Sequence, residues 1–234
     1  SLKNIEPALL PAQYISIHII DKKNIKNMTT DSHHPFAPYI PEDATKLIIG
    51  TIPPFRFCET NPELRKDDVF FYYGSNDNSF WELIGEAINK KFTYTNSESS
   101  INERKEALRS LKMGITDIIE SCIHENGESS DSKLKNITKK DIDVLLKANP
   151  QIDTLIYTSE FVKKLMNDHF KTYHTLTPDQ PKAQSVKIDH KTYNVHILYS
   201  PSPSALRNMG TDGKQKRLEQ YKRILTQEIS SYIL

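Results

Sequence analysis

The feature that most constrains the fold of this chain is an alternation of short apolar runs with longer amphipathic segments. Four apolar runs are predicted strands, at 46–52 (KLIIGTI), 114–119 (GITDII), 153–157 (DTLIY) and 192–199 (TYNVHILY). Between them, apolar residues recur every three or four positions, which is typical of helices. Buried strands that alternate with helices predict a parallel sheet covered on both faces. We therefore expect an α/β fold, a three-layer αβα sandwich with a central four-stranded, mainly parallel sheet.

Capping signals and apolar periodicity place the helices between these strands. Two of the helices are expected to begin at Ser-x-x-Glu capping boxes, Ser79–Glu82 and Ser100–Glu103. The predicted helices span about 79–91, 100–113, 138–146 and 160–170, with a last one from about residue 213. The segment 121–137 is predicted to be a polar loop, and a further loop is expected before the strand at 192–199.

No composition shift or internal repeat divides the chain, so we expect one domain over 1–234 with an irregular lead-in over 1–45. Within the lead-in, SIHII (16–20) reads as a short strand or a packed arm, and 34–43 carries three prolines that exclude a helix interior. The adjacent pair His33–His34 is expected in a loop. No apolar run approaches the roughly 20 residues that span a bilayer, and no secretory signal is recognisable.

Cysteine content and charge bound the function further. Cys58 and Cys122 are too few for a disulfide framework or a thiolate metal cluster, so a cytoplasmic location is expected. The net charge of +1 excludes a polyelectrolyte binder as a whole. The segment 203–223 nevertheless holds six Lys or Arg against two acidic residues. Such a patch indicates either phosphate binding or a solvated helix face.

Common catalytic motifs are absent from the sequence. It contains no GxxxxGK[ST] phosphate loop, no GxGxxG fingerprint and no GxSxG elbow, and neither cysteine has a histidine partner nearby in sequence. Three peptides remain: GTIPP (50–54), the aromatic turn FFYYGSNDNSFWELI (70–84) and SPSPS (200–204). Two of them follow predicted strands, and ligands of parallel sheets bind at the carboxyl ends of the strands.

Taken in order, these peptides resemble the motifs of the uracil-DNA glycosylase superfamily. LIIGTIPP (47–54) is similar to the Gly-x-x-Pro motif after the first core strand, and LYSPSPSALR (198–207) to the Ser- and Pro-rich final motif. YGSNDNSFWELIG (73–85) and GITDIIESCIHENGESSDSKL (114–134) resemble the mismatch-specific and hypoxanthine-type branches. The resemblance extends from about His34 to about Leu225. It implies an enzyme that flips a nucleotide out of DNA and holds its base in a narrow pocket.

The resemblance also implies roles for individual residues. Asn78 and Asp117 would be catalytic, with Asn78 orienting the attacking water, although Asn78 is also suited to capping a helix and Asp117 to a structural hydrogen bond. Tyr73 would stack on the base, while Phe70, Phe71 and Tyr72 would support the pocket wall or pack inward. The remaining pocket-lining residues would be Gly50, Thr51, Ile52 and Pro53. The predicted DNA-contacting residues are Ser200, Ser202, Ser204, Arg207, Lys214, Lys216 and Arg217.

One departure from the superfamily pattern leaves alternatives open. The best-known members carry Asp or Asn immediately before the first-motif proline, and here that residue is Ile52, which cannot orient water. The leading hypothesis is a monomeric, monofunctional DNA glycosylase that removes uracil or hypoxanthine without metal or cofactor. The first alternative is a catalytically silent nucleic-acid-binding protein of the same fold. The second is a hydrolase or transferase that acts on small nucleosides.

Overall fold

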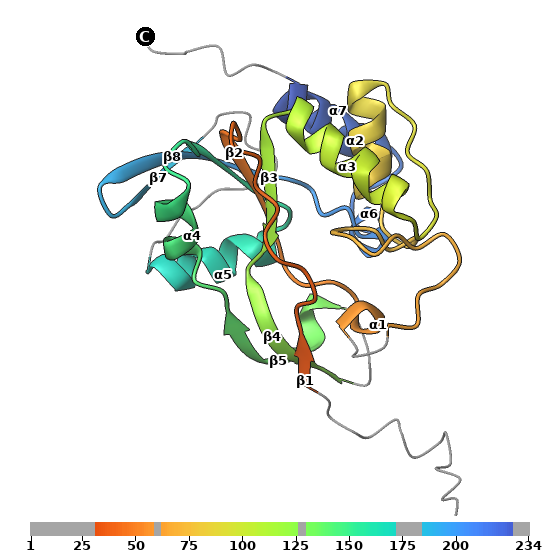
Figure 1. Ribbon diagram of the computed structural model, residues 1–234, viewed down its shortest axis with the longest axis horizontal. Coiled ribbons are helices and arrows are strands. Elements are labelled where there is room, and N and C mark those ends of the chain that lie inside the picture. Colours follow the sequence, from red (N-terminus) through yellow and green to blue (C-terminus); the bar gives the residue numbers. More distant parts are fainter. Residues whose placement is uncertain (1–30, 59–61, 126–129, 172–183, 227–234) are drawn as a thin grey trace, which may run out of the picture.

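The computed structural model describes residues 31–58, 62–125, 130–171 and 184–226, and its centre is a five-stranded sheet (Figure 1). The strand order is β3 (Met113–Asp117), β2 (Lys46–Gly50), β6 (Thr154–Tyr157), β8 (Lys191–Ile197) and β7 (Gln184–Ile188). The first four strands pair in parallel and correspond to the four predicted strands. The expected α/β class is therefore confirmed. The fifth strand, β7, is an antiparallel edge strand that the sequence analysis placed in a loop.

Helices cover both faces of this sheet, as predicted (Figure 1). Alternate residues of β2 serve the two faces, because successive side chains of a strand point in opposite directions. Leu47 and Ile49 join one core cluster with α4 (Ile142–Ala148) and α5 (Glu160–Phe170). Ile48 joins the other cluster with α2 (Phe80–Ile88), α3 (Glu98–Ser110) and α7 (Gly213–Thr226). Two short helices, α1 (Phe55–Cys58) and α6 (Pro203–Leu206), lie in the loops.

A second, antiparallel sheet corrects the predicted polar loop at 121–137. It consists of β1 (Asp31–His33), β4 (Ile119–His124) and β5 (Leu134–Lys139), in that order. The run 114–119 is therefore not one strand, since β3 ends at Asp117 and β4 begins two residues later. The segment was missed because β4 and β5 bury only some of their residues and carry polar side chains at the others.

The helices α3 and α4 start at other residues than predicted, whereas α2 starts after Ser79 as expected but is capped by a different side chain. At α2, Ser79 makes no side-chain cap, and Oδ1 of Asn78 instead accepts from the N–H of Phe80 at 2.8 Å. At α3, the cap is Ser97, whose side chain accepts from the Ser100 N–H at 3.2 Å. The helix expected from residue 138 begins only after Asp141, which caps α4. Both predicted capping boxes are therefore wrong.

The parallel arrangement directs four strand ends to one edge of the central sheet. Gly50 at the end of β2 is the register partner of Asp117 at the end of β3, and β6 and β8 end at Tyr157 and Ile197. In the described lead-in, the short strand β1 is paired with β4. The possible strand at 16–20 and the chain beyond α7 lie outside the described residues. No helix among the described ranges is long and apolar enough to cross a membrane.

Candidate active site

A pocket of about 630 Å³ lies at this edge of the central sheet. The three peptides singled out in the sequence meet in its wall, together with the end of β3. The predicted site residues that line it are Thr51, Ile52, Pro53, Tyr73, Asn78, Asp117, Ser200, Ser202 and Ser204. Its volume lies within the range of small-molecule pockets, roughly 300–1,000 Å³. The fold therefore brings together most of the predicted site.

Gly50 is required by a close approach at the floor of this site. A Cβ atom at this position would lie 2.1 Å from Oδ1 of Asp117 and 2.2 Å from the hydroxyl oxygen of Tyr73. Real Cβ atoms do not come this close to other heavy atoms. The absence of a side chain at Gly50 thus lets a carboxylate and a phenol converge on the end of β2.

Tyr73 is held rigidly in an uncommon backbone conformation. Its φ of 55° lies in the left-handed region, which a bulky residue adopts only where the surroundings enforce it. Its hydroxyl donates to Oγ1 of Thr158 at 2.7 Å, and its ring stacks on Phe80 with centroids 4.2 Å apart. Burial, with the nearby Asp117 carboxylate, raises the pKa of Tyr73 well above its ordinary value, so the phenol stays neutral.

The neighbouring aromatic residues form the wall behind Tyr73. Phe71 and Tyr72 are buried in the core cluster that contains α2, and the indole Nε1 of Trp81 donates to the carbonyl of Tyr72 at 2.7 Å. Phe70 stacks on Phe57 of α1 with centroids 5.8 Å apart. These contacts agree with the expected supporting role of the three residues before Tyr73.

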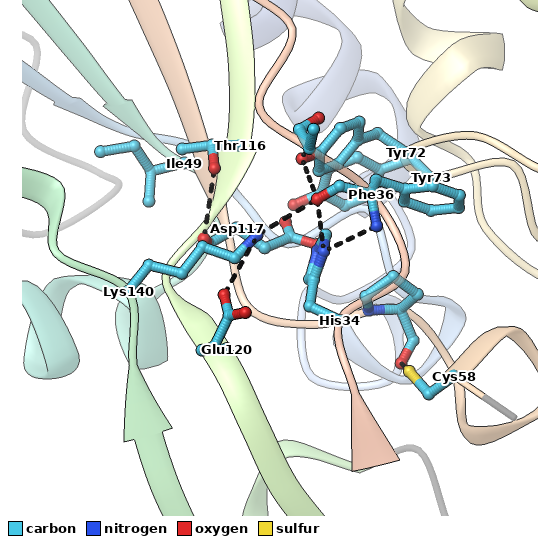
Figure 2. A network of polar contacts seen from close by, with 12 residues as sticks. His34, Phe36, Ile49, Cys58, Tyr72, Tyr73, Thr116, Asp117, Glu120 and Lys140 are labelled. Atoms are coloured by element: carbon cyan, nitrogen blue, oxygen red, sulfur yellow. Dashed lines mark hydrogen bonds and ion pairs between the residues drawn. The ribbon is translucent and has the colours of Figure 1, made fainter. Parts of the chain in front are cut away.

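His34 is the main site residue that the sequence analysis missed. Its Nε2 lies 2.8 Å from Oδ2 of Asp117, and the two side chains are 0% and 6% exposed. Its Nδ1 lies 2.9 Å from the carbonyl oxygen of Phe36 and 3.1 Å from the Phe36 nitrogen. Figure 2 shows the two side chains pointing toward each other from segments that are far apart in sequence. The expectation of a loop is wrong for His33, which ends β1, whereas His34 lies just after the strand and its N–H donates to the carbonyl of Glu120.

Asp131 is a second residue that local sequence signals did not reveal. It begins the short 3₁₀ helix η3 (Asp131–Lys133) after β4 and lines the pocket. Burial, together with the nearby Asp117 carboxylate, raises the pKa of its carboxyl to about 6, although a hydrogen bond with the Thr51 side chain acts in the opposite direction. Asp131 therefore adds to the pocket a carboxyl group that ionises less readily than an ordinary aspartate.

Asn78 caps α2 with one atom of its side-chain amide and leaves the other atom available. Its Oδ1 caps α2 through the Phe80 N–H, as the structural alternative proposed. The residue also lines the pocket, and no described residue accepts a hydrogen bond from its Nδ2. The capping bond therefore fixes the side chain and leaves one amide N–H donor group for a ligand or water.

The turn that carries Tyr73 and Asn78 is fastened by a buried ion pair. Nε and Nη2 of Arg56 donate to the two oxygens of Asp68 at 2.9 Å each, and Nη2 also donates to Oγ of Ser75. Burial acts to raise the pKa of Asp68, but Arg56 and the N–H groups of Asn76 and Arg65 hold it below its ordinary value. The carboxylate of Asp68 thus stays ionised and joins α1 to the pocket wall.

The predicted DNA-contacting residues fall into two groups. Arg207, Lys214 and Lys216 are exposed, and Lys216 pairs with Asp212 at 3.0 Å. Arg217 is only 3% exposed, and its Nη1 donates to the carbonyls of Ser200 and Ser202 at 3.1 and 3.3 Å. Its burial argues against the predicted phosphate contact. These hydrogen bonds instead hold the serine- and proline-rich loop at 200–204 in place.

Other chemistries find little support in the described ranges of the chain. Sγ of Cys122 does lie 3.9 Å from Nδ1 of His124, contrary to the expectation from local sequence. Burial, however, raises the pKa of this thiol to about 11, which disfavours the nucleophilic thiolate. No group of three or more His, Cys, Asp or Glu side chains among the described residues is arranged to hold a metal ion.

The fold and the pocket define a class of protein: an αβα sandwich whose ligand site lies at the carboxyl ends of parallel strands. Over 125 residues, the chain is 27% identical to a hypoxanthine DNA glycosylase of Methanosarcina barkeri. These residues make up 53% of this chain and 70% of that protein. Its fold matches the solution NMR structure of a protein from Methanosarcina acetivorans, provisionally named a uracil DNA glycosylase, with a TM-score of 0.53 and 16% identity. That match covers 83% of this chain and 99% of the other.

No family model matches the sequence. The sequence relative and the structural neighbour nevertheless both carry names of DNA glycosylases. The similarity of the chain to these two proteins supports the resemblance of its motifs to the uracil-DNA glycosylase superfamily.

Proposed function

We propose that this protein is a monofunctional DNA glycosylase that hydrolyses the N-glycosidic bond of a flipped deaminated base, uracil or hypoxanthine, and leaves an abasic site. The observation that carries the proposal is the convergence of Tyr73, Asn78 and Asp117 on one pocket at the end of the central sheet. The sequence relative, which is named a hypoxanthine DNA glycosylase, supports the same substrate class. The enzyme would act as a monomer and without a metal or cofactor.

Base binding would rest on the rigid ring of Tyr73. Phe80 covers one face of the ring and Thr158 fixes its hydroxyl, so the opposite face is the one left for a base. Aromatic stacking contributes roughly 1–3 kcal/mol per base, which offsets part of the cost of flipping. Backbone N–H groups of Thr51 and Ile52, with the Thr51 hydroxyl, would supply donors at the same end of the pocket.

Bond cleavage would need a positioned water and a group that stabilises the positive charge of the sugar. Asn78 has a fixed side chain with an N–H donor group left over, which suits it to orient water rather than to remove a proton. Asp117 carries the charge that would stabilise an oxocarbenium-like transition state. Both residues line the same pocket as Ile52, whose apolar side chain is suited to neither task.

DNA would lie across the loop at 200–204 and the start of α7. The hydroxyls of Ser200, Ser202 and Ser204 line the pocket mouth and would hold the phosphates beside the flipped nucleotide. Exposed Arg207, Lys214 and Lys216 would add sequence-independent attraction. Arg217 would hold the loop in shape without contacting DNA.

The test is excision from labelled duplexes that each contain one uracil or one hypoxanthine, followed by alkaline cleavage of abasic sites. We expect wild-type protein to cut at least one of them equally well with and without EDTA. Asn78→Ser retains a short capping acceptor but removes the amide, so it should lose most of the activity while still binding DNA. Asn76→Ala is the matched control, because this exposed residue of the same turn uses only its backbone N–H, toward Asp68.

A specific observation favours a second candidate, since Ile52 replaces a water-orienting residue. A binding-only protein would show salt-dependent affinity for duplex DNA but no cleavage of any substrate. Folded wild-type protein that binds but never cuts would therefore replace the first proposal with this one. Affinity that does not change between low and high salt would contradict both.

A further inference from the structure

His34 and Asp117 form a buried pair in which Asp117 lines the pocket and His34 lies behind it, although 83 positions separate them in sequence. The contact joins Nε2 to Oδ2 at 2.8 Å, and the ring of His34 packs against Phe36 and Tyr72 with centroids 5.7 and 5.5 Å apart. The Phe36 backbone fixes the other ring nitrogen. Both ends of the imidazole are therefore constrained, so Oδ2 of Asp117 has a single position.

The second oxygen of Asp117 is in a different situation. Oδ1 lies beside the backbone of Gly50 and near the Tyr73 hydroxyl, at the end of β2. In the part of the chain that the structure describes, no group donates a hydrogen bond to it. One oxygen of the carboxylate is thus held by His34, and the other is left for a ligand or water at the floor of the pocket.

The position of this free oxygen compensates for the departure in the first motif. Gly50 and Asp117 are register partners on neighbouring strands, so the carboxylate enters the site two residues before Ile52, from β3 instead of β2. The ammonium group of Lys140 interacts electrostatically with Asp117 and pairs with Glu120 at 4.0 Å (Figure 2).

We propose that Asp117 is the carboxylate that accepts the proton of the attacking water, and that His34 is the positioning residue that aims it. This inference rests on the glycosylase function proposed above. The C1′–N bond breaks with its electron pair leaving on the base, the water oxygen bonds to C1′, and Asp117 takes the water proton. That proton passes to solvent, and the departing base takes one from solvent.

The test compares His34 variants in single-turnover excision at saturating enzyme. His34→Phe keeps an aromatic ring against Phe36 and Tyr72 but removes the donor to Asp117, and it should slow excision about 100-fold, as small misplacements of reacting groups do. His34→Gln places an amide N–H near the former Nε2 and should recover about ten-fold of that loss. The matched control is His33→Phe, which changes an exposed neighbour in β1 and should not alter the rate.

A double-mutant cycle distinguishes positioning from general support of the fold. If His34 acts through Asp117, the double variant His34→Phe/Asp117→Asn should be no slower than Asp117→Asn alone. The dissociation constant for DNA should remain within about two-fold of the wild-type value, because uniform binding is untouched. Thermal unfolding of each variant shows whether it is folded.

Three results would each overturn the inference while leaving the proposed function intact. The first is a rate for folded His34→Phe within about three-fold of wild type, and the second is equal slowing by the Gln and Phe variants. The third is additive losses in the double variant. A wild-type protein that cuts no substrate would instead overturn the proposed function, and the inference with it. If His34→Phe does not fold, the His34→Gln rate and its cycle with Asp117→Asn decide the matter by the same criteria.

Discussion

Replacement of Asp131 by asparagine should stabilise the protein at neutral pH and much less at acid pH. The structure raises the pKa of this carboxyl from 3.8 to about 6, through burial and the neighbouring Asp117. Each pKa unit corresponds to 1.36 kcal/mol, so ionised Asp131 costs the fold about 3 kcal/mol. Asparagine retains the shape and can still bond to the Thr51 hydroxyl, but it carries no charge to desolvate.

The sign of the effect follows from proton linkage. A group whose pKa is raised in the folded state binds protons more tightly there, so its destabilising effect is absent below the unfolded pKa and complete above the folded one. The advantage of Asp131→Asn should therefore be about 0.5 kcal/mol at pH 4 and rise to about 3 kcal/mol at pH 7.5. The groups that face Asp131 are Asp117, Thr51 and Tyr73.

Urea unfolding at pH 4, 5.5 and 7.5 measures this difference directly, provided that the slope against urea concentration is the same for both proteins. Asp168→Asn is the control, because a hydrogen bond from Lys139 lowers the pKa of this exposed carboxyl. Its variant should not gain stability as pH rises. If Asp131→Asn had the same advantage at all three pH values, or none at pH 7.5, burial of an ionisable group in this pocket would not be the cause.

Four further substitutions test other parts of the structure. Gly50→Ala should slow excision by about 100-fold in the duplex assay, because its methyl group displaces Asp117 or Tyr73. Arg104→Ala should lower the free energy of unfolding by about 3 kcal/mol or more in urea, since this fully buried guanidinium packs over three aromatic rings. Arg217→Ala should weaken DNA binding without changing its salt dependence, whereas Lys214→Ala should reduce the slope of log affinity against log salt by about 1. The assignment of Gly50 would be contradicted by unchanged excision, and that of Arg104 by a loss below about 1 kcal/mol. Equal salt slopes for the Arg217 and Lys214 variants would contradict their different roles.

The central sheet was predictable because a strand buried on both faces leaves a continuous apolar run. Leu47, Ile48 and Ile49 serve two different cores, and no polar residue interrupts them. The site followed from the same signal, since the peptides after such strands necessarily lie at one edge. GTIPP and SPSPS needed no knowledge of side-chain packing to be placed together.

The second sheet was not predictable in the same way, because its strands are only partly buried. In β5, no residue is fully buried, and most residues are polar or charged. Such a strand resembles a loop in sequence, and only pairing with β4 shows it to be a strand. The helix caps failed for a related reason: Ser79 and Asn78 are both good capping residues, and tertiary contacts decide between them.

The failure to find His34 and the failure to find the second sheet have the same physical origin. β1 pairs with β4 in the register Ser32 to Cys122 and His33 to Ser121, and the N–H of His34 then donates to the carbonyl of Glu120. Because β4 begins only two residues after Asp117, this ladder ends next to the edge of the central sheet where the parallel strands end. The register of β1 therefore determines where the imidazole of His34 lies.

A shift of one residue in that register would turn His34 to the other face and leave Asp117 without its partner. Ser32 counters such a shift, because it is 1% exposed and its hydroxyl lies 2.9 Å from Nδ1 of His124, a buried side chain on β4. Burial lowers the pKa of His124 to about 4, so the ring is neutral near pH 7 and can stay inside the sheet. A strand of three residues with little apolar surface thus contributes to the site through its register, and it could not be recognised from its own sequence.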